Sequence, residues 1–311
     1  MADLGTMFGA GAAETFMGLP RCDDLAGLTA RVALMGAGAI TSYPSVGAYC
    51  AGAPAAIRAA AATYAANLTH MNFDLGTPTL PDPGAAVDCG DLPTVDGDGA
   101  GNRALVRDAV AMMLDRGAVP VLLGGDDSLP IPMLEAFAGR GKFTILQIDA
   151  HIDWRQEVED EPLGLSSTMR RASEMDHIER IVQVGQRGIG SARPGDYQDA
   201  LDWGVAFVPA SEVARRGVQA ALDLIPEGSD IIVCFDCDAL DPAIMPAVIG
   251  RTAGGLGYWQ AVELIAGAAA RGRIAAFDLV EFMPDRDIDG QAALLAAQLV
   301  AATLGIIARQ G

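Results

Sequence analysis

The sequence predicts an α/β fold in which helices cover both faces of a mainly parallel sheet. Short apolar segments alternate with helical segments of about ten residues or more, as expected for parallel strands joined by helical crossovers. Apolar residues make up 51% of the chain, which provides ample material for a core. We see no internal repeat, low-complexity segment or linker, so we expect a single domain over residues 1–311.

The elements can be placed in order along the chain. Residues 1–30 have little periodicity and contain a turn at 15–20, so we interpret them as an arm lying over the domain or over a neighbouring subunit. Pro54 is suited to open the first helix. Predicted strands cover residues 32–35, 87–91, 119–123, 143–148, 181–184, 205–209, 231–235 and 274–280. Predicted helices cover residues 55–68, 103–116, 130–138, 169–174, 197–203, 211–224, 258–270 and 290–308.

The charge balance limits the class of partner. The formal net charge is -19, from 21 Lys and Arg against 40 Asp and Glu. Nucleic acids and anionic membranes need clustered positive charge, so we exclude both as partners. A small cationic substrate is compatible with this balance, and most of the acidic groups need be no more than a solvated surface.

Cysteine usage and the chain ends predict a cytoplasmic protein. The five cysteines form no disulfide scaffold, which fits a reducing compartment. The first residues lack the basic start and apolar core of a secretory signal. The apolar stretch 292–308 is interrupted by Gln298 and is short for a bilayer, so we expect a buried terminal helix.

Two acidic rows follow apolar strands and predict a metal site. Side chains two residues apart in an extended chain point to the same side. Asp149, His151 and Asp153 therefore form one row, and Asp236 and Asp238 form a second. Two such rows that face each other make a metal site.

Two further strand ends carry acidic groups. Asp126 and Asp127 follow the strand at 119–123, and Glu281 follows the strand at 274–280. Ligands of parallel α/β sheets bind at the carboxyl ends of the strands. A lone Asp at such a place is commonly a helix cap or a turn former, but acidic groups at four strand ends favour a shared site.

With these motifs the chain resembles the ureohydrolase family, which includes arginase, agmatinase and related guanidino hydrolases. The turn at 15–20 resembles the agmatinase arm. The main resembling motifs are GGDDS at 124–128, DAHID at 149–153, DCDALDP at 236–242 and DLVE at 278–281.

The resemblance implies a three-layer arginase-like fold and a homo-oligomer, usually a trimer or hexamer. It also implies two manganese ions bridged by a hydroxide that attacks a guanidino compound, giving urea and an amine. Carried over by position, Asp149 and Asp236 would bridge both ions, and Asp153 would complete the first site. His151 and Asp238 would complete the second. Glu281 would bind the guanidinium, and Asp153 would pass the hydroxide proton to the leaving amine.

The chain departs from the family pattern at two positions. Asp127 stands where the family has a metal-binding His, and Leu165 stands where a second His helps with proton transfer. Neither His70 nor His177 can replace them by position, and we expect both at the surface or at caps. As a fifth carboxylate ligand, Asp127 would hold metal and attract cations while making bound water less acidic.

These observations predict an agmatinase-like hydrolase, with agmatine favoured over arginine by the arm. Oxygen-rich ligands with one imidazole suit Mn²⁺, with two ions expected and one also compatible. Two alternatives stay open. One is a metal-binding relative that has lost turnover with its two histidines. The other is a hydrolase of another linear amidine C–N bond.

Overall fold

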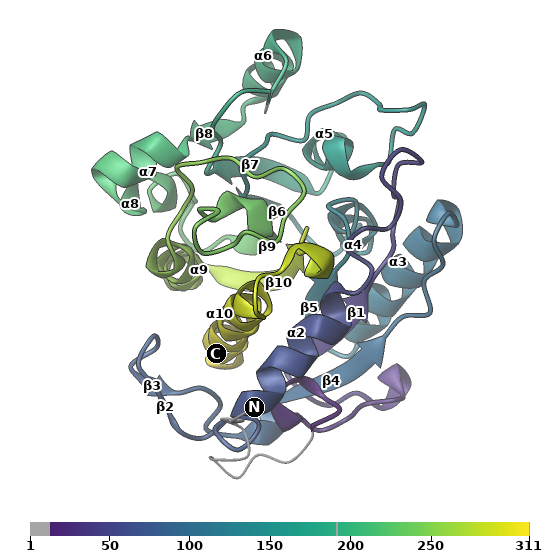
Figure 1. The fold of residues 1–311 in the computed structure, drawn as a ribbon, viewed down its shortest axis with the longest axis vertical. Helices are drawn as coiled ribbons and strands as arrows, with labels where there is room; N and C mark the ends of the chain where they lie inside the picture. Colours follow the sequence, from purple (N-terminus) through teal and green to yellow (C-terminus); the bar gives the residue numbers. More distant parts are fainter. Residues whose placement is uncertain (1–12, 191, 311) are drawn as a thin grey trace.

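The chain folds around one eight-stranded sheet with the strand order β4-β1-β5-β10-β9-β6-β7-β8 (Figure 1). The computed structural model describes residues 13–190 and 192–310. Every neighbouring pair of strands in this sheet is parallel. The predicted α/β class with a parallel sheet is therefore confirmed.

The strands are mostly apolar and buried, as a sheet covered on both faces requires, with partly exposed residues concentrated in the two edge strands. They are β1 (Val32–Ala37), β4 (Ala86–Asp91), β5 (Val119–Gly124), β6 (Phe143–Ile148), β7 (Ile178–Val184), β8 (Ala206–Val208), β9 (Asp230–Asp236) and β10 (Arg273–Val280). In register, Ile148 of β6 pairs with Phe235 of β9, and Val280 of β10 pairs with Asp236. These three strands therefore end at the same level.

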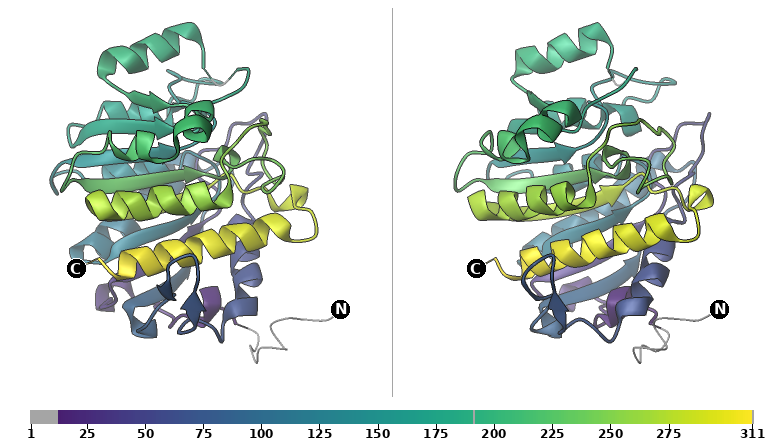
Figure 2. Two further views of the ribbon diagram at one scale, coloured as in Figure 1. Left: turned by 90° about the vertical axis from the view of Figure 1, so that its left-hand side faces the viewer. Right: turned by 60° about the vertical axis from the view of Figure 1, so that its left-hand side comes forward.

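Helices form a layer on each face of the sheet, so the core has two halves (Figure 2). Alternate residues of β1 pack into opposite halves, because side chains alternate along a strand. One half is covered by α2 (Ala53–Ala61), α7 (Ala210–Arg216), α8 (Gln219–Leu222), α9 (Tyr258–Arg271) and α10 (Gln291–Ala308). The other is covered by α3 (Gly99–Asp115), α4 (Pro130–Glu135), α5 (Thr168–Ser173) and α6 (Pro194–Trp203).

The terminal helix α10 is a core helix. Its length and its mean hydropathy of 1.8 would suit a membrane span, but 72% of it is buried inside the fold. It packs against α2 and α9, and in Figure 2 it lies beside α9. The predicted buried terminal helix is confirmed.

Several predicted elements differ in extent. α2 ends at Ala61 rather than at residue 68, and a 3-10 turn follows at Ala62–Tyr64. The predicted helix 211–224 is two short helices, because Gly217 between α7 and α8 has φ 75° and leaves the helical region. The antiparallel hairpin of β2 (Met71–Asn72) and β3 (Thr77–Pro78) was not predicted.

His177 is buried rather than at the surface, and it takes the other expected position, that of a cap, at the last turn of α4. It is 8% exposed, and its ring Nε2 lies 2.9 Å from the carbonyl oxygen of Leu134. The ring also meets Phe143 edge-on, with centroids 6.2 Å apart. His177 therefore joins α4 to the start of β6.

The described part of the predicted arm is fastened to the domain, while residues 1–12 lie outside the described residues. It contains 3-10 turns at Phe16–Gly18 and Leu25–Gly27. The backbone N–H of Phe16 donates to Asp88 Oδ2 over 2.7 Å, and Arg58 Nε donates to the same oxygen over 2.7 Å. A buried ion pair of α2 and β4 thus holds the arm.

Candidate metal centre

The four strands whose ends carry the acidic groups are neighbours in the sheet, in the order β5-β10-β9-β6. Their carboxyl ends meet at one edge and open into a cleft of about 210 Å³. Asp149 lies beneath this cleft and is fully buried. The predicted residues that line the cleft are Asp127, His151, Asp153, Asp236, Asp238 and Glu281.

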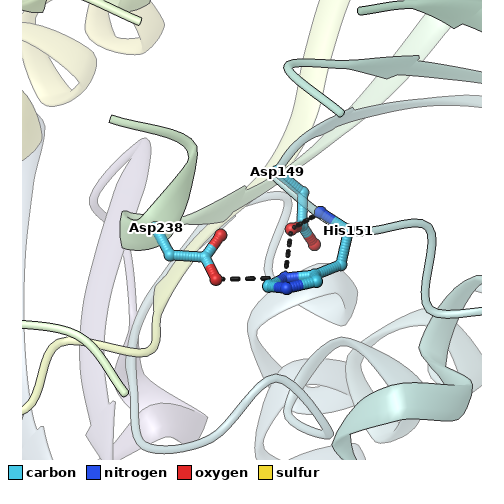
Figure 3. Close-up of side chains that lie close together, drawn as sticks. All are labelled: Asp149, His151 and Asp238. Atoms are coloured by element: carbon cyan, nitrogen blue, oxygen red, sulfur yellow. Dashed lines mark hydrogen bonds and ion pairs between the residues drawn. The ribbon is translucent and has the colours of Figure 1, made fainter. Parts of the chain in front are cut away.

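One group of possible metal ligands is centred on His151 (Figure 3). Its ring Nδ1 lies 3.0 Å from Asp238 Oδ2 and 3.5 Å from Asp149 Oδ1. One ligand atom from each of these residues lies within 4.8 Å of the others. Backbone N–H groups fix both carboxylates, since His151 N donates to Asp149 Oδ1 over 2.6 Å and Ala150 N to Asp238 Oδ1 over 3.2 Å.

A second group consists of Asp127, Asp149 and Asp153, again with ligand atoms within 4.8 Å of one another. Asp149 is therefore common to both groups. Asp127 Oδ2 is buried and has no hydrogen-bond partner among the described residues. An unpaired buried carboxylate oxygen is costly unless a cation or a proton satisfies it. Asp236 lines the cleft but belongs to neither group, and its Oδ1 accepts from Asp238 N over 2.6 Å.

The electrostatics of this centre call for bound cations. Burial raises the pKa values of Asp127, Asp153 and Asp236 well above their usual range, and neighbouring carboxylates raise them further. Burial alone would lower the pKa of His151, but hydrogen bonds with Asp149 and Asp238 raise it to about 12. Without metal, protons thus occupy the positions that divalent ions would take. The oxygen-rich donor set fits a hard divalent metal ion.

This proton uptake predicts how the stability of the metal-free protein depends on pH. In the unfolded chain the carboxyl groups lose their protons near pH 4. In the folded state their pKa values are raised, and the pKa of Glu281 is raised to about 8. The folded state then binds more protons, so stability present at low pH is lost as the pH rises. We expect a lower Tm at about pH 8 than at about pH 5 in chelator.

Scanning calorimetry checks this expectation. Added divalent metal should flatten the pH dependence, and Asp127→Asn should reduce it because one titrating group is gone. A Tm in chelator that is equal or higher at the upper pH would contradict the electrostatic description.

Two buried glutamines orient the carboxylates and were not predicted. Gln147 Nε2 donates to Asp149 Oδ2 and to Asp153 Oδ2, each over 2.7 Å. Gln183 on β7 donates to Gln147 Oε1 and, over 2.9 Å, to the carbonyl oxygen of Ile152. Partners of this kind fix the direction of metal ligands. A Gln inside each of the otherwise apolar segments 145–148 and 181–184 was the signal in the sequence.

Glu281 is held in an unusual backbone conformation at the end of β10. Its φ is 65°, in a region that few non-glycine residues adopt, and its N–H donates to Gly125 O over 2.9 Å. Its Oε1 accepts from Asp127 N over 2.9 Å. Gly125 also packs closely against Gly38, because a Cβ at position 125 would lie 2.2 Å from Gly38 O. Tyr49, which was not predicted, donates its hydroxyl to Glu281.

Leu165, which stands where the family has a second histidine, lies at the cleft. It lines the cleft together with Ser166. Its side chain can exclude water but cannot carry a proton. Among the described residues, His151 is the one histidine that lines the cleft, so neither His70 nor His177 stands in for the second imidazole.

Comparison with known proteins identifies a family and several relatives of this chain. The profile described as "Arginase family" matches residues 30–305. Mitochondrial agmatinase of Gallus gallus is 32% identical over 201 residues, which are 63% of this chain and 58% of that protein. Guanidinobutyrase of Pseudomonas aeruginosa is 32% identical over 194 residues, 60% of each. The matches thus span less than two thirds of these relatives.

Solved structures include a close match in fold. The crystal structure of a hypothetical agmatinase from Burkholderia thailandensis is 25% identical and superposes with a TM-score of 0.81. The match covers 96% of this chain and 92% of that one. The similarity therefore includes the sheet and both helix layers.

Proposed function

The chain belongs to the arginase family, and we propose that it is an agmatinase-like ureohydrolase. In this proposal it is a metal-dependent hydrolase that cleaves a guanidino compound to urea and an amine. The observation that carries the proposal is the position of Asp149, which is shared by two groups of ligand atoms at the floor of one cleft. A shared carboxylate of this kind suits a pair of metal ions.

The two groups assign ligands to each half of the centre. Asp127, Asp149 and Asp153 would hold one ion, and Asp149, His151 and Asp238 the other. Asp236, which lines the same cleft, is the proposed second shared ligand. We propose Mn²⁺, because one imidazole among carboxylates suits it. Bound divalent metal lowers the pKa of water from 15.7 to about 7 and so supplies a nucleophile at neutral pH.

The chain's own residues would bind the substrate and move the proton. Glu281 faces the cleft and offers a carboxylate to a guanidinium group. Asp153, oriented by Gln147, would take a proton from the attacking water and pass it to the leaving amine. Its φ of 43° shows that the loop holds it in an uncommon conformation at this place. Leu165 and Trp154 line the walls and would limit water near the reacting atoms.

With Asp127 in place of a histidine, the proposed ligands of the first metal ion are all carboxylates. Two unit charges about 4 Å apart interact by roughly 4 kcal/mol at an effective dielectric near 20. The additional anion therefore strengthens the attraction for metal and for cationic substrates. This supports a substrate with a cationic tail, and we propose agmatine ahead of arginine.

We also propose that the protein is a homo-oligomer, a trimer or hexamer, and that it works in the cytoplasm. The family resemblance supports the assembly. The five cysteines, all free in the structure, support a reducing compartment.

A substrate panel tests the proposal. Purified protein loaded with Mn²⁺, and with bound metal verified, is incubated with agmatine, arginine, guanidinobutyrate and guanidine while urea is measured. We expect urea from at least one of them, with agmatine first, and none after chelation. If all four give no urea while metal is bound, the proposal fails.

The apolar Leu165 in the cleft favours a second candidate, a metal-binding relative without turnover. In that case the double variant Asp127→His with Leu165→His should gain urea release that the natural chain lacks. Hydrolysis of another linear amidine by the same attack would instead release an amine and an amide other than urea. An assay of the amine and of urea separates these candidates.

A further inference from the structure

Tyr49 reaches Glu281 from a distant part of the chain. It lies in the loop 38–52 between β1 and α2. Its hydroxyl oxygen is 2.9 Å from Glu281 Oε1 and 2.7 Å from Oε2. A hydroxyl has a single proton, so it bridges the two oxygens or favours the nearer one.

The loop that carries Tyr49 is well anchored. Thr41 N donates to Ser128 Oγ over 2.9 Å, and Ser42 Oγ donates to Asp126 Oδ2 over 3.2 Å. At the opposite wall of the cleft, Tyr43 OH accepts from Ser166 N over 3.1 Å. The loop that carries Tyr49 is thus bonded, near its start, to the two residues that flank Asp127.

Glu281 needs such a contact to stay in place. A glutamate side chain has several rotatable bonds. The carboxylates of Asp127, Asp153, Asp236 and Asp238, which line the same cleft, also repel its charge. Asp127 N holds Oε1 over 2.9 Å, and the nearest donor to Oε2 is Tyr49. Each carboxylate oxygen can accept two bonds. When the Tyr49 proton is donated to the nearer Oε2, each oxygen accepts one bond and retains capacity for one of the paired N–H groups of a guanidinium.

We propose that Tyr49 is a positioning residue that fixes the Glu281 carboxylate for two-point recognition of a guanidinium, and so selects guanidino compounds over plain amines. This inference rests on the proposed function. Burial raises the pKa of the Tyr49 phenol, and the neighbouring Glu281 raises it further, so the hydroxyl keeps its proton and stays a donor.

The test compares ligand binding in Tyr49→Phe and Tyr64→Phe. The control Tyr64 has a hydroxyl that accepts from Gln298 Nε2 over 2.9 Å on the outside of the fold. Rapid-mixing titration of the Mn²⁺-loaded protein, read before turnover, measures Kd for agmatine and for 1,4-diaminobutane, which lacks the guanidinium. In Tyr49→Phe we expect agmatine to bind about tenfold more weakly or worse, because a hydrogen bond to a charged group is lost. Diamine affinity and metal content should not change.

A double-mutant cycle separates positioning from a general structural effect. If Tyr49 acts through Glu281, adding Tyr49→Phe to Glu281→Gln should weaken agmatine binding little further. In turnover, KM should rise more than kcat falls. Unchanged agmatine affinity in Tyr49→Phe, additive losses in the cycle, or no agmatine binding by the natural chain each overturn the inference. Agmatine binding without urea release would contradict the proposed function but leave the positioning role measurable through Kd.

Discussion

Asp149→Asn is expected to remove both metal ions from the centre. Asp149 is the residue common to both groups of ligand atoms, and it is fully buried. Asn keeps the size of the side chain but loses its charge. Loss of a partner that only orients a ligand costs about 10–100-fold in metal affinity, so loss of a shared ligand should cost at least about 100-fold. Metal content and urea release should both fall toward background.

Elemental analysis after dialysis, together with a urea assay, checks this result. Asp108→Asn is a matched control, because Asp108 is exposed and pairs only with Arg107 on the surface. The control should keep its metal. A variant Asp149→Asn that retains two ions and full activity would show that the metal lies elsewhere.

Glu281→Gln is expected to have the second largest effect, and on substrate rather than on metal. Removing one partner of a buried charge pair costs about 3–5 kcal/mol, which corresponds to a loss of roughly 10²–10⁴-fold in kcat/KM. Gln keeps an acceptor for the bonds from Asp127 N and Tyr49. The centre and its metal content should therefore stay intact.

Steady-state kinetics with agmatine and a parallel metal analysis check this prediction. Glu135→Gln, on the surface of α4 near Arg107, serves as the control and should behave like the natural chain. A Glu281→Gln variant with normal kcat/KM would mean that another group binds the guanidinium. Loss of metal in this variant would instead place Glu281 among the ligands.

The sequence was most informative where local patterns decide the structure. Apolar strands such as 143–148 and 231–235 are recognised by composition, and the turn residues after them place Asp149 and Asp236 at strand ends. The prediction that strand ends gather at one edge needed only the general behaviour of parallel sheets. Local signals were insufficient at Gly217, whose left-handed conformation divides a helix that looked continuous.

Local sequence patterns did not reveal the long-range contacts. The order β5-β10-β9-β6 places the four acidic strand ends side by side, and no local pattern reveals that order. Tyr49 meets Glu281 across 232 positions of the chain, within a loop without a distinctive signal. The burial of His177 and its bond to Leu134 were not predicted for the same reason, since Leu134 lies 43 residues away.

The number of metal ions per chain tests the central claim most directly. Protein that has been loaded with Mn²⁺ and dialysed is analysed for metal and for protein concentration. Because the ligand atoms form two groups that share Asp149, we predict two ions per chain, reduced to none in Asp149→Asn. One ion per chain at saturation would contradict the proposal, since it would mean that Asp127 does not complete the first site in place of a histidine.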